Sequence, residues 1–116
     1  MGSSTRRDDM LASFERAKRD REAVADALAT IEQFNSRLAA GRTAWFWPTI
    51  GAALATKHHW LVVACDSCGT IIEMDLTMKR RDPDASILTA LRDVRCTRCN
   101  GQGRTRVTGL SRFPSA

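Results

Sequence analysis

The sequence predicts an α+β protein in which a long N-terminal helix precedes a small cysteine-rich domain of short strands. Two observations lead to this fold class. Residues 9–40 contain neither proline nor glycine and are rich in Ala, Arg, Glu and Leu, which favour a helix. The four cysteines of the chain then occur as two C-x-x-C pairs, Cys65/Cys68 and Cys96/Cys99. With 116 residues in all, we expect one small domain and an extension.

The N-terminal part predicts a single amphipathic helix over Asp9–Ala40, after an unstructured tip of residues 1–7. Gly41 stands where a C-terminal cap belongs. Apolar residues recur at alternating intervals of four and three, as in a coiled-coil heptad, with polar interruptions at Arg21 and Asn35. The positions of this seam are Met10, Phe14, Ala17, Arg21, Val24, Leu28, Ile31, Asn35 and Leu38.

A helix of this length exceeds what a small domain can bury, and its apolar side chains need cover. We therefore expect it to pair with another copy of the chain or a partner, or to fold back on the domain, rather than to stay a solvated amphipathic helix. A lone buried Asn in such a seam often sets the register or the number of helices. The candidate partner-binding residues on the helix are Phe14, Leu28 and Ile31, and the predicted assembly is a homo-oligomer.

Residues 42–59 join the helix to the cysteine-rich domain and contain three consecutive aromatic residues, Trp45, Phe46 and Trp47. Our preferred interpretation is that these rings fill the core between the helix and the domain, because the chain has few other aromatic residues. The alternative is a stacking platform for nucleobases or an anchor for a protein partner, with Trp45 and Trp47 making the contacts. A short helix over residues 49–56 or 49–57 is expected to follow.

The two C-x-x-C pairs predict a single tetrahedral Zn²⁺ site, because each tight turn brings two thiolates to the same ion. Gly69 follows the first pair and Asn100-Gly101 follows the second, and these residue types readily adopt a positive φ. The alternatives are disulfides, a thioredoxin-type redox motif or an iron–sulfur cluster. Four cysteine ligands leave no open position for water, so the site is expected to be structural. The predicted ligands are Cys65, Cys68, Cys96 and Cys99.

The cysteine-rich domain is expected to be a four-cysteine zinc ribbon, with two hairpins joined by a short helix between the two knuckles. Its predicted elements are strands at 60–64 and 70–76, a helix at 85–92 and a returning strand at 104–110. The predicted organisation of the chain is the amphipathic helix 1–41, the junction 42–59, the zinc ribbon 60–112 and the tail 113–116.

The formal net charge of +5 lies wholly in the second part of the chain. Residues 41–116 hold 11 Lys/Arg and 6 Asp/Glu, whereas residues 1–40 hold seven of each. Four thiolates on one Zn²⁺ would lower the total to +3. Arg95 and Arg98, beside the second pair of cysteines, could simply offset the charge of such a centre. If the basic residues share a face, they predict contacts to phosphates. The candidate nucleic-acid-binding residues are Lys79, Arg80, Arg81, Arg92, Arg98, Arg104 and Arg106.

These features favour a zinc-stabilised module that binds nucleic acid or takes part in transcription. The alternative is a protein–protein adaptor that oligomerises through its helix without touching nucleic acid. Catalysis is not expected, because no Ser-His-Asp set, phosphate-binding glycine loop or H-E-x-x-H motif is found. His58 and His59 are expected to end the short helix rather than to bind metal. The sequence has neither an apolar run of about 18 residues nor a signal peptide, and four free thiols suit a reducing cytoplasm.

Several stretches of residues 45–100 resemble a group of short alphaproteobacterial proteins with two C-x-x-C pairs flanking a D-P-D or H-P-D turn. The matching residues are P-T-I-G-A-A-L-A from Pro48, W-L-V-V-A-C-D-S-C-G-T from Trp60, D-L at Asp75, R-D-P-D-A-S-I from Arg81 and R-C-T-R-C from Arg95. The resemblance implies a zinc-ribbon-like fold and a bacterial cytoplasm, and it brings no established activity. Members of the group often carry His where this chain has Asp82, so no role of that histidine transfers here.

Overall fold

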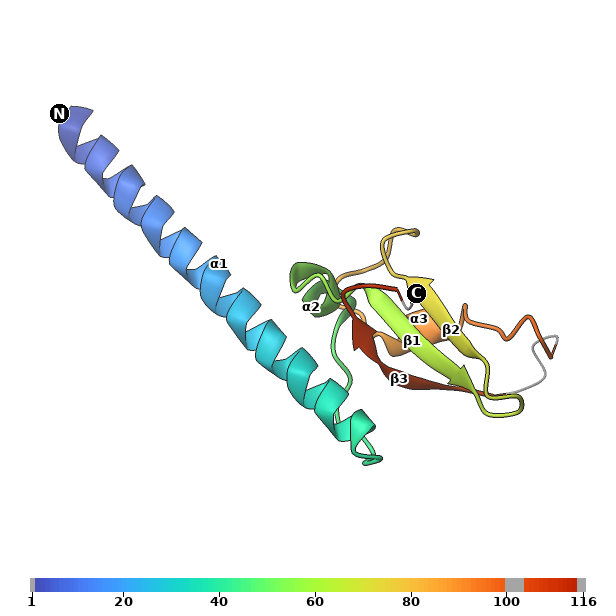
Figure 1. Cartoon of the computed structure of the whole chain (residues 1–116). Coiled ribbons are helices and arrows are strands. Elements are labelled where there is room, and N and C mark those ends of the chain that lie inside the picture. Colours follow the sequence, from blue (N-terminus) through green and yellow to red (C-terminus); the bar gives the residue numbers. More distant parts are fainter. Residues whose placement is uncertain (1, 100–103, 115–116) are drawn as a thin grey trace.

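The chain folds as a long helix joined to a small sheet domain. The computed structural model describes the backbone of residues 2–99 and 104–114, with side chains from residue 8 onward. The three strands form one antiparallel sheet in the order β2-β1-β3 (Figure 1). The predicted α+β class, with the four cysteines gathered in the domain, is confirmed. The elements are α1 (Gly2–Ala39), α2 (Ile50–Ala55), β1 (Trp60–Cys65), β2 (Ile71–Asp75), α3 (Leu88–Leu91) and β3 (Thr105–Ser111).

Among the described side chains, those of α1 that pack against the domain lie in its last third. Ile31 and Phe34 are fully buried, and Leu38 packs against the same core. Every side chain from residue 8 to residue 26 is exposed, and the N-terminal part of the helix extends away from the sheet (Figure 1). The expectation that the domain cannot bury the whole helix is therefore confirmed, and the domain takes the part that carries Ile31 and Phe34.

The helix begins at Gly2 and not at Asp9. The expected unstructured tip is therefore wrong for residues 2–7, whose backbone is helical. Those residues include no proline, so nothing in the backbone prevents the helix from continuing toward the N-terminus.

Asn35 bonds to the edge of β3 in its own chain. Its Nδ2 donates to the carbonyl of Leu110 at 2.8 Å, and the N–H of Leu110 donates to its Oδ1 at 2.8 Å. Gly109 leaves space for this contact, since a Cβ there would lie 3.0 Å from Asn35 Oδ1. The polar atoms of the predicted seam position are thus satisfied within the chain. The heptad-like spacing of apolar residues extends through the last third of α1 because the helix docks on the domain with the apolar face that carries this spacing.

The core lies between the sheet, α2 and the docked end of α1. Thr49 caps α2, since its Oγ1 accepts from the N–H of Ala52 at 3.1 Å. Leu61 and Val63 of β1 are fully buried, so this strand presents alternate side chains to the core. Ile50, Leu76, Ile87 and Leu110 complete the buried cluster with smaller residues.

α3 is a single turn, shorter than the predicted helix over 85–92. The backbone just before α3 pairs with another segment and is not helical, because Ser86 forms an isolated antiparallel bridge with Thr49. The N–H of Ile50 donates to Ala85 O at 2.9 Å, and the N–H of Ile87 donates to Pro48 O at 3.0 Å. The helix can therefore start only after this extended pairing ends.

As far as residues 60–99 and 104–114 are described, the domain contains one three-stranded sheet and not two hairpins. β1 and β2 form the predicted hairpin around the first cysteine pair. β3, however, pairs with β1 and not with a strand that enters the second cysteine pair. Residues 92–96 form turns and irregular backbone, so they offer β3 no partner. Within the described residues, no helix combines the length and the hydropathy that a bilayer crossing requires.

Candidate metal centre

The first pair of cysteines lies at the tip of the β1–β2 hairpin. Cys65 ends β1, and the N–H of Gly69 donates back to Cys65 O at 2.8 Å. Gly69 has φ +73°, so the predicted left-handed residue after this pair is confirmed. The corresponding residues after the second pair, Asn100 and Gly101, lie outside the described residues.

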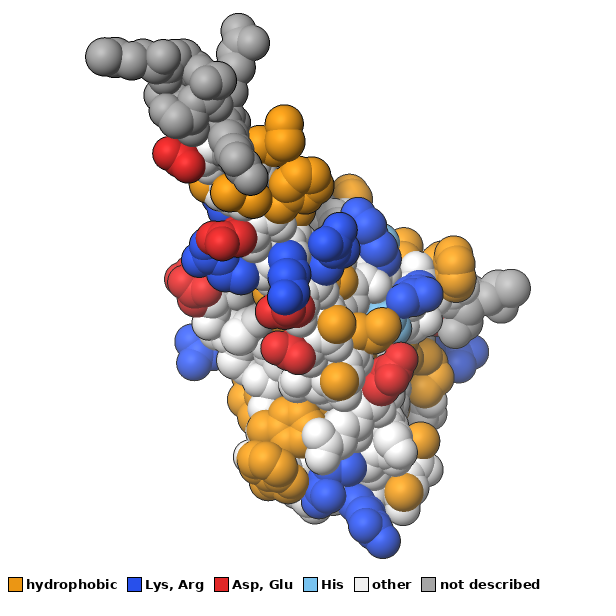
Figure 2. Space-filling model, turned by 90° about the vertical axis from the view of Figure 1, so that its left-hand side faces the viewer, with side chains coloured by type: hydrophobic (Ala, Val, Ile, Leu, Met, Phe, Trp, Pro, Cys, Tyr) orange, Lys and Arg blue, Asp and Glu red, His pale blue; other side chains and the backbone are white. Residues whose placement is uncertain are grey.

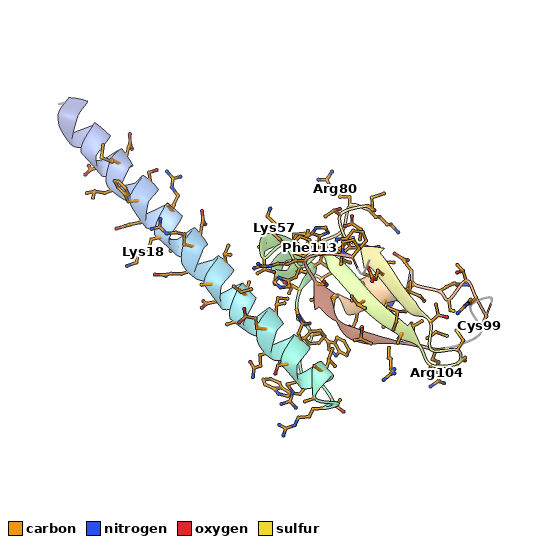
Figure 3. The ribbon with its side chains drawn as sticks, in the orientation of Figure 1. Lys18, Lys57, Arg80, Cys99, Arg104 and Phe113 are labelled. Carbon is orange, nitrogen blue, oxygen red and sulfur yellow. The ribbon has the colours of Figure 1, made fainter. Side chains whose placement is uncertain are left out.

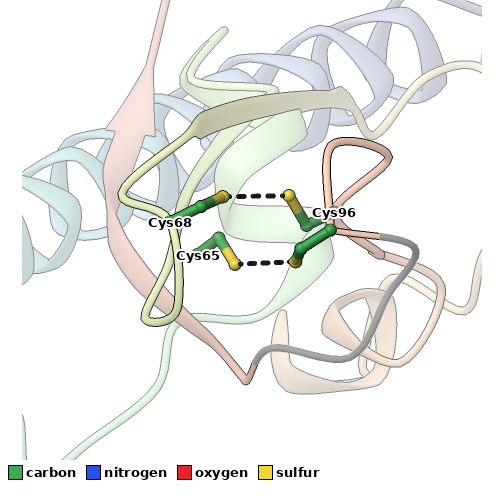
Figure 4. Close-up of side chains that lie close together, drawn as sticks. Cys65, Cys68 and Cys96 are labelled. Carbon is green, nitrogen blue, oxygen red and sulfur yellow. Dashed lines mark hydrogen bonds between the residues drawn. The ribbon is translucent and has the colours of Figure 1, made fainter.

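The four thiols converge at one end of the sheet. The Sγ atoms of Cys65 and Cys99 are 3.6 Å apart, and those of Cys68 and Cys96 are 3.4 Å apart (Figure 4). All four Sγ atoms lie within 4.8 Å of one another. A disulfide would place two of them about 2.05 Å apart, so the cysteines are free thiols in this arrangement. The sequence prediction that the two pairs form one group able to hold a metal ion is confirmed.

The thiols differ in their surroundings. Cys65 and Cys96 are buried, Cys99 is half-buried and Cys68 is exposed. Thr70 lowers the pKa of Cys68 to about 6, first through its hydroxyl and then through its backbone N–H, with Cys96 adding to the effect. The hydroxyl Oγ1 lies 3.0 Å from the sulfur. Thr70 therefore stabilises the thiolate form in which a cysteine binds metal.

Cys65 has the opposite tendency. The backbone N–H of Cys68 acts to lower its pKa, but burial together with the neighbouring thiols of Cys99 and Cys68 raises the pKa to about 11. A cation at the centre of the group would oppose this effect, because a positive charge favours the ionised thiol. The four thiols are therefore a group that could hold a metal ion.

Two contacts tie the first cysteine turn to β3. The N–H of Asp66 donates to Arg104 O at 2.8 Å. The carboxylate of Asp66 lies 3.1 Å from Nε of Arg106, in an exposed ion pair. No sequence pattern indicated the contribution of Thr70 or Asp66, since neither residue type is required by the C-x-x-C motif. Their roles follow from the pairing of β1 with both β2 and β3.

The predicted nucleic-acid-binding residues lie at two ends of the sheet. Arg80 follows β2 and lies at one end, whereas Arg104 lies near Cys99 at the other (Figure 3). Lys79 and Arg81 both contact the carboxylate of Asp93, at 3.4 and 3.0 Å. These two cations are therefore already partly neutralised within the chain. Arg92, Arg95 and Arg98 are exposed, the last two beside the second cysteine pair.

The predicted partner-binding residues also differ in exposure. Phe14 is 65% exposed and Trp45 is 74% exposed, while Leu28 is half-buried. Ile31 is covered by the chain's own domain and is not on the surface. Trp47 is 38% exposed, and its ring packs against Phe34 at 5.6 Å between centroids. Viewed from the side of α1, hydrophobic side chains form separate groups among charged ones (Figure 2).

The three junction aromatics therefore divide between two roles. Phe46 is half-buried and packs edge-on against Phe34, with ring centroids 6.1 Å apart. Phe46 packs against the core, as the preferred interpretation predicts, and Trp47 contacts Phe34 but is 38% exposed. The interpretation is wrong for Trp45, which is 74% exposed.

The histidines take part in local contacts away from the thiols. His59 Nδ1 lies 2.9 Å from the carboxylate of Asp75, at the end of β2. The hydroxyl of Thr77, its backbone N–H and His59 together lower the pKa of Asp75. His58 Nδ1 lies 3.0 Å from Thr56 O. Among the described residues, the potential metal-binding group consists of the four cysteines.

Comparison of the chain with protein-family models, with curated proteins and with solved structures finds no match.

Proposed function

We propose that the chain is a zinc-stabilised interaction module, in which the metal holds the sheet domain together and α1 binds a second copy of the chain. The observation that carries the proposal is the convergence of four thiols from two turns, in a chain whose helix exposes every side chain from residue 8 to residue 26. The thiols can hold the domain rigid through a metal, and the exposed helix offers a surface to a partner. The proposal assigns no catalysis to the metal.

The thiol geometry fits Zn²⁺ well. With zinc–sulfur distances of about 2.3 Å, a regular tetrahedron places its sulfurs about 3.8 Å apart. The contacts of 3.6 and 3.4 Å between the two cysteine pairs are close to that spacing. A four-thiolate site has no open position for water, so its bound ion would be structural. Mass spectrometry of the native chain should find a single zinc ion, whereas iron with visible absorption would refute this assignment.

α1 supports self-association because most of its large exposed apolar residues keep one spacing, with Leu11 outside it. Met10 and Phe14 are more than half exposed and Val24 is 41% exposed. With Leu28, they stand at intervals of a heptad seam on the projecting part of the helix. A solvated helix with such a stripe gains stability mainly by packing it against another surface. A second copy offers the same stripe, as a symmetric pair requires.

Sedimentation equilibrium of the zinc-loaded chain tests this part of the proposal. Wild type should associate as its concentration rises, and Phe14→Glu should stay monomeric at the same concentrations. Arg16→Glu changes charge on a position outside the seam and serves as the matched control. A wild-type chain that remains monomeric at all concentrations would refute pairing through α1.

A second candidate function is nucleic-acid binding at the metal end of the sheet. It is supported by Arg95, Arg98 and Arg104, which are exposed and have no ion pair among the described residues. Contacts of these cations to phosphates would make binding strongly salt-dependent. A mobility shift on duplex and single-stranded DNA should then weaken in Arg98→Glu and Arg104→Glu but not in Lys18→Glu. The absence of any shift at low salt would exclude this function.

A further inference from the structure

A groove of about 490 Å³ lies between the end of α1, α3 and the first half of β3. It is separate from the thiols and from the exposed stripe of α1. Its apolar lining includes Leu38, Trp47, Leu88 and Leu91, and Arg42 and Arg106 also border it. This volume lies within the range of binding sites for small ligands and for side chains of a docked peptide.

One wall of the groove is the outer edge of β3. The sheet order β2-β1-β3 gives β3 a strand neighbour on one side only. At Leu110 the outer edge is occupied by Asn35, whose carboxamide bonds both backbone groups as a neighbouring strand residue would. Residues 105–108 line the groove. Residues 105–107 pair with β1, Thr108 is the extra residue of an irregularity opposite Val62 and Val63, and none of the four has another backbone partner among the described residues. Such an edge accepts an extended segment readily.

The positive charges of Arg42 and Arg106 beside the groove favour a segment that carries acidic residues. Arg42 is exposed and has no ion pair within residues 8–99 and 104–114. Arg106 is 70% exposed, and its Nε lies 3.1 Å from the carboxylate of Asp66 in an exposed ion pair. Arg42 can therefore bond a carboxylate from a ligand directly, whereas Arg106 would do so in competition with Asp66.

We propose that this groove binds an extended peptide of a partner protein that alternates apolar and acidic residues. The peptide would pair with residues 105–107 of β3 as an added strand, a known mode of peptide recognition. Its apolar side chains would enter the space between Leu38, Trp47, Leu88 and Leu91. Its carboxylates would lie near Arg42 and Arg106. A fatty carboxylate would fill the apolar space but would leave the backbone groups of the strand edge unpaired.

Nuclear magnetic resonance of the zinc-loaded full chain tests the proposal with a short synthetic peptide in which valine and glutamate alternate. Titration should shift the amide signals of residues 105–108 and the indole signal of Trp47 in a saturable way. Arg42→Glu should weaken binding about fivefold, because an exposed attraction becomes a repulsion. Lys18→Glu makes the same change in net charge on the projecting part of α1 and should bind like wild type.

Two further ligands make the result decisive. A peptide that alternates valine and lysine, and a valine–glutamate peptide interrupted by proline, should both bind much more weakly. Equal binding of the lysine peptide, or shifts confined to residues outside the groove, would overturn the proposal. Binding of dodecanoate in the groove without binding of the valine–glutamate peptide would overturn it as well. None of these outcomes depends on whether α1 self-associates.

Discussion

Replacing Asn35 tests how α1 is held to the domain. Asn35→Ala removes two hydrogen bonds of 2.8 Å and leaves the N–H and carbonyl of Leu110 without their partner in a partly buried position. A net loss of about 1 kcal/mol per bond, with a further cost for unsatisfied groups, gives about 2–3 kcal/mol of destabilisation. This is a large share of the stability of a small domain.

The assay is urea unfolding of the zinc-loaded chain, followed by tryptophan fluorescence. With a slope of about 1–3 kcal/mol per molar urea, the midpoint should fall by roughly 1 M or more in Asn35→Ala. Gln33→Ala changes an exposed side chain on the same turn of the helix and should leave the midpoint nearly unchanged.

Asn35→Leu separates this role from that of a coiled-coil seam. In a helix pair, exchange of a buried seam Asn for Leu raises stability while relaxing the choice of partner number. In the arrangement observed here, Leu cannot bond the strand edge, so the variant should be destabilised about as much as Asn35→Ala. An Asn35→Leu chain as stable as wild type, or more stable, would refute the reasoning.

Three further predictions concern the metal centre. Removal of zinc by a strong chelator, or Cys96→Ser, should strongly reduce the near-ultraviolet dichroism of the tryptophans while α1 retains part of its helicity, because the small sheet domain depends on the metal for stability. An unchanged near-ultraviolet spectrum would contradict this. Thr70→Val removes the hydroxyl that lies 3.0 Å from Cys68 Sγ. It should lower the affinity for zinc about tenfold, as measured by competition with a chromophoric chelator. An unaltered affinity would show that this hydroxyl does not stabilise the thiolate. Gly69→Ala should lower the free energy of unfolding in urea by about 1 kcal/mol, because φ at this residue is +73°, although a Cβ there would meet nothing within 4 Å. Gly69→Asn should lower it less, since Asn adopts a positive φ more readily than Ala. An unchanged free energy of unfolding in Gly69→Ala would mean that the turn can relax.

The sequence was most informative at the cysteines, because metal binding by thiols requires a definite spacing along the chain. Two thiols on each turn must reach one ion, so the cysteine group could be predicted down to its members. The turn residue Gly69 followed from the same requirement. Strand β1 could be predicted from its apolar residues, and a short helix was expected where α2 is found.

The arrangement of these elements was less predictable. Apolar residues at intervals of three and four serve equally for a helix pair and for docking on a domain, so the pattern could not show that Ile31 would be buried within its own chain. Phe34 lies one position before Asn35 and outside the seam, yet it is fully buried, because the docking face is wider than a coiled-coil seam. The pairing of β3 with β1 depends on contacts between distant residues, which no local pattern records.

The docking of α1 through Ile31 and Phe34 makes the rest of the helix a spacer of fixed length and phase. From Ile31 to Phe14 the axis rises about 26 Å, at about 1.5 Å per residue. Insertion of about seven residues between them would lengthen this spacer by about 10 Å with little rotation of the apolar stripe. Insertion of about two residues would turn the stripe to nearly the opposite side with little change in length. The reach of the projecting helix and the direction in which it presents its apolar side chains can therefore be varied separately, without altering the core.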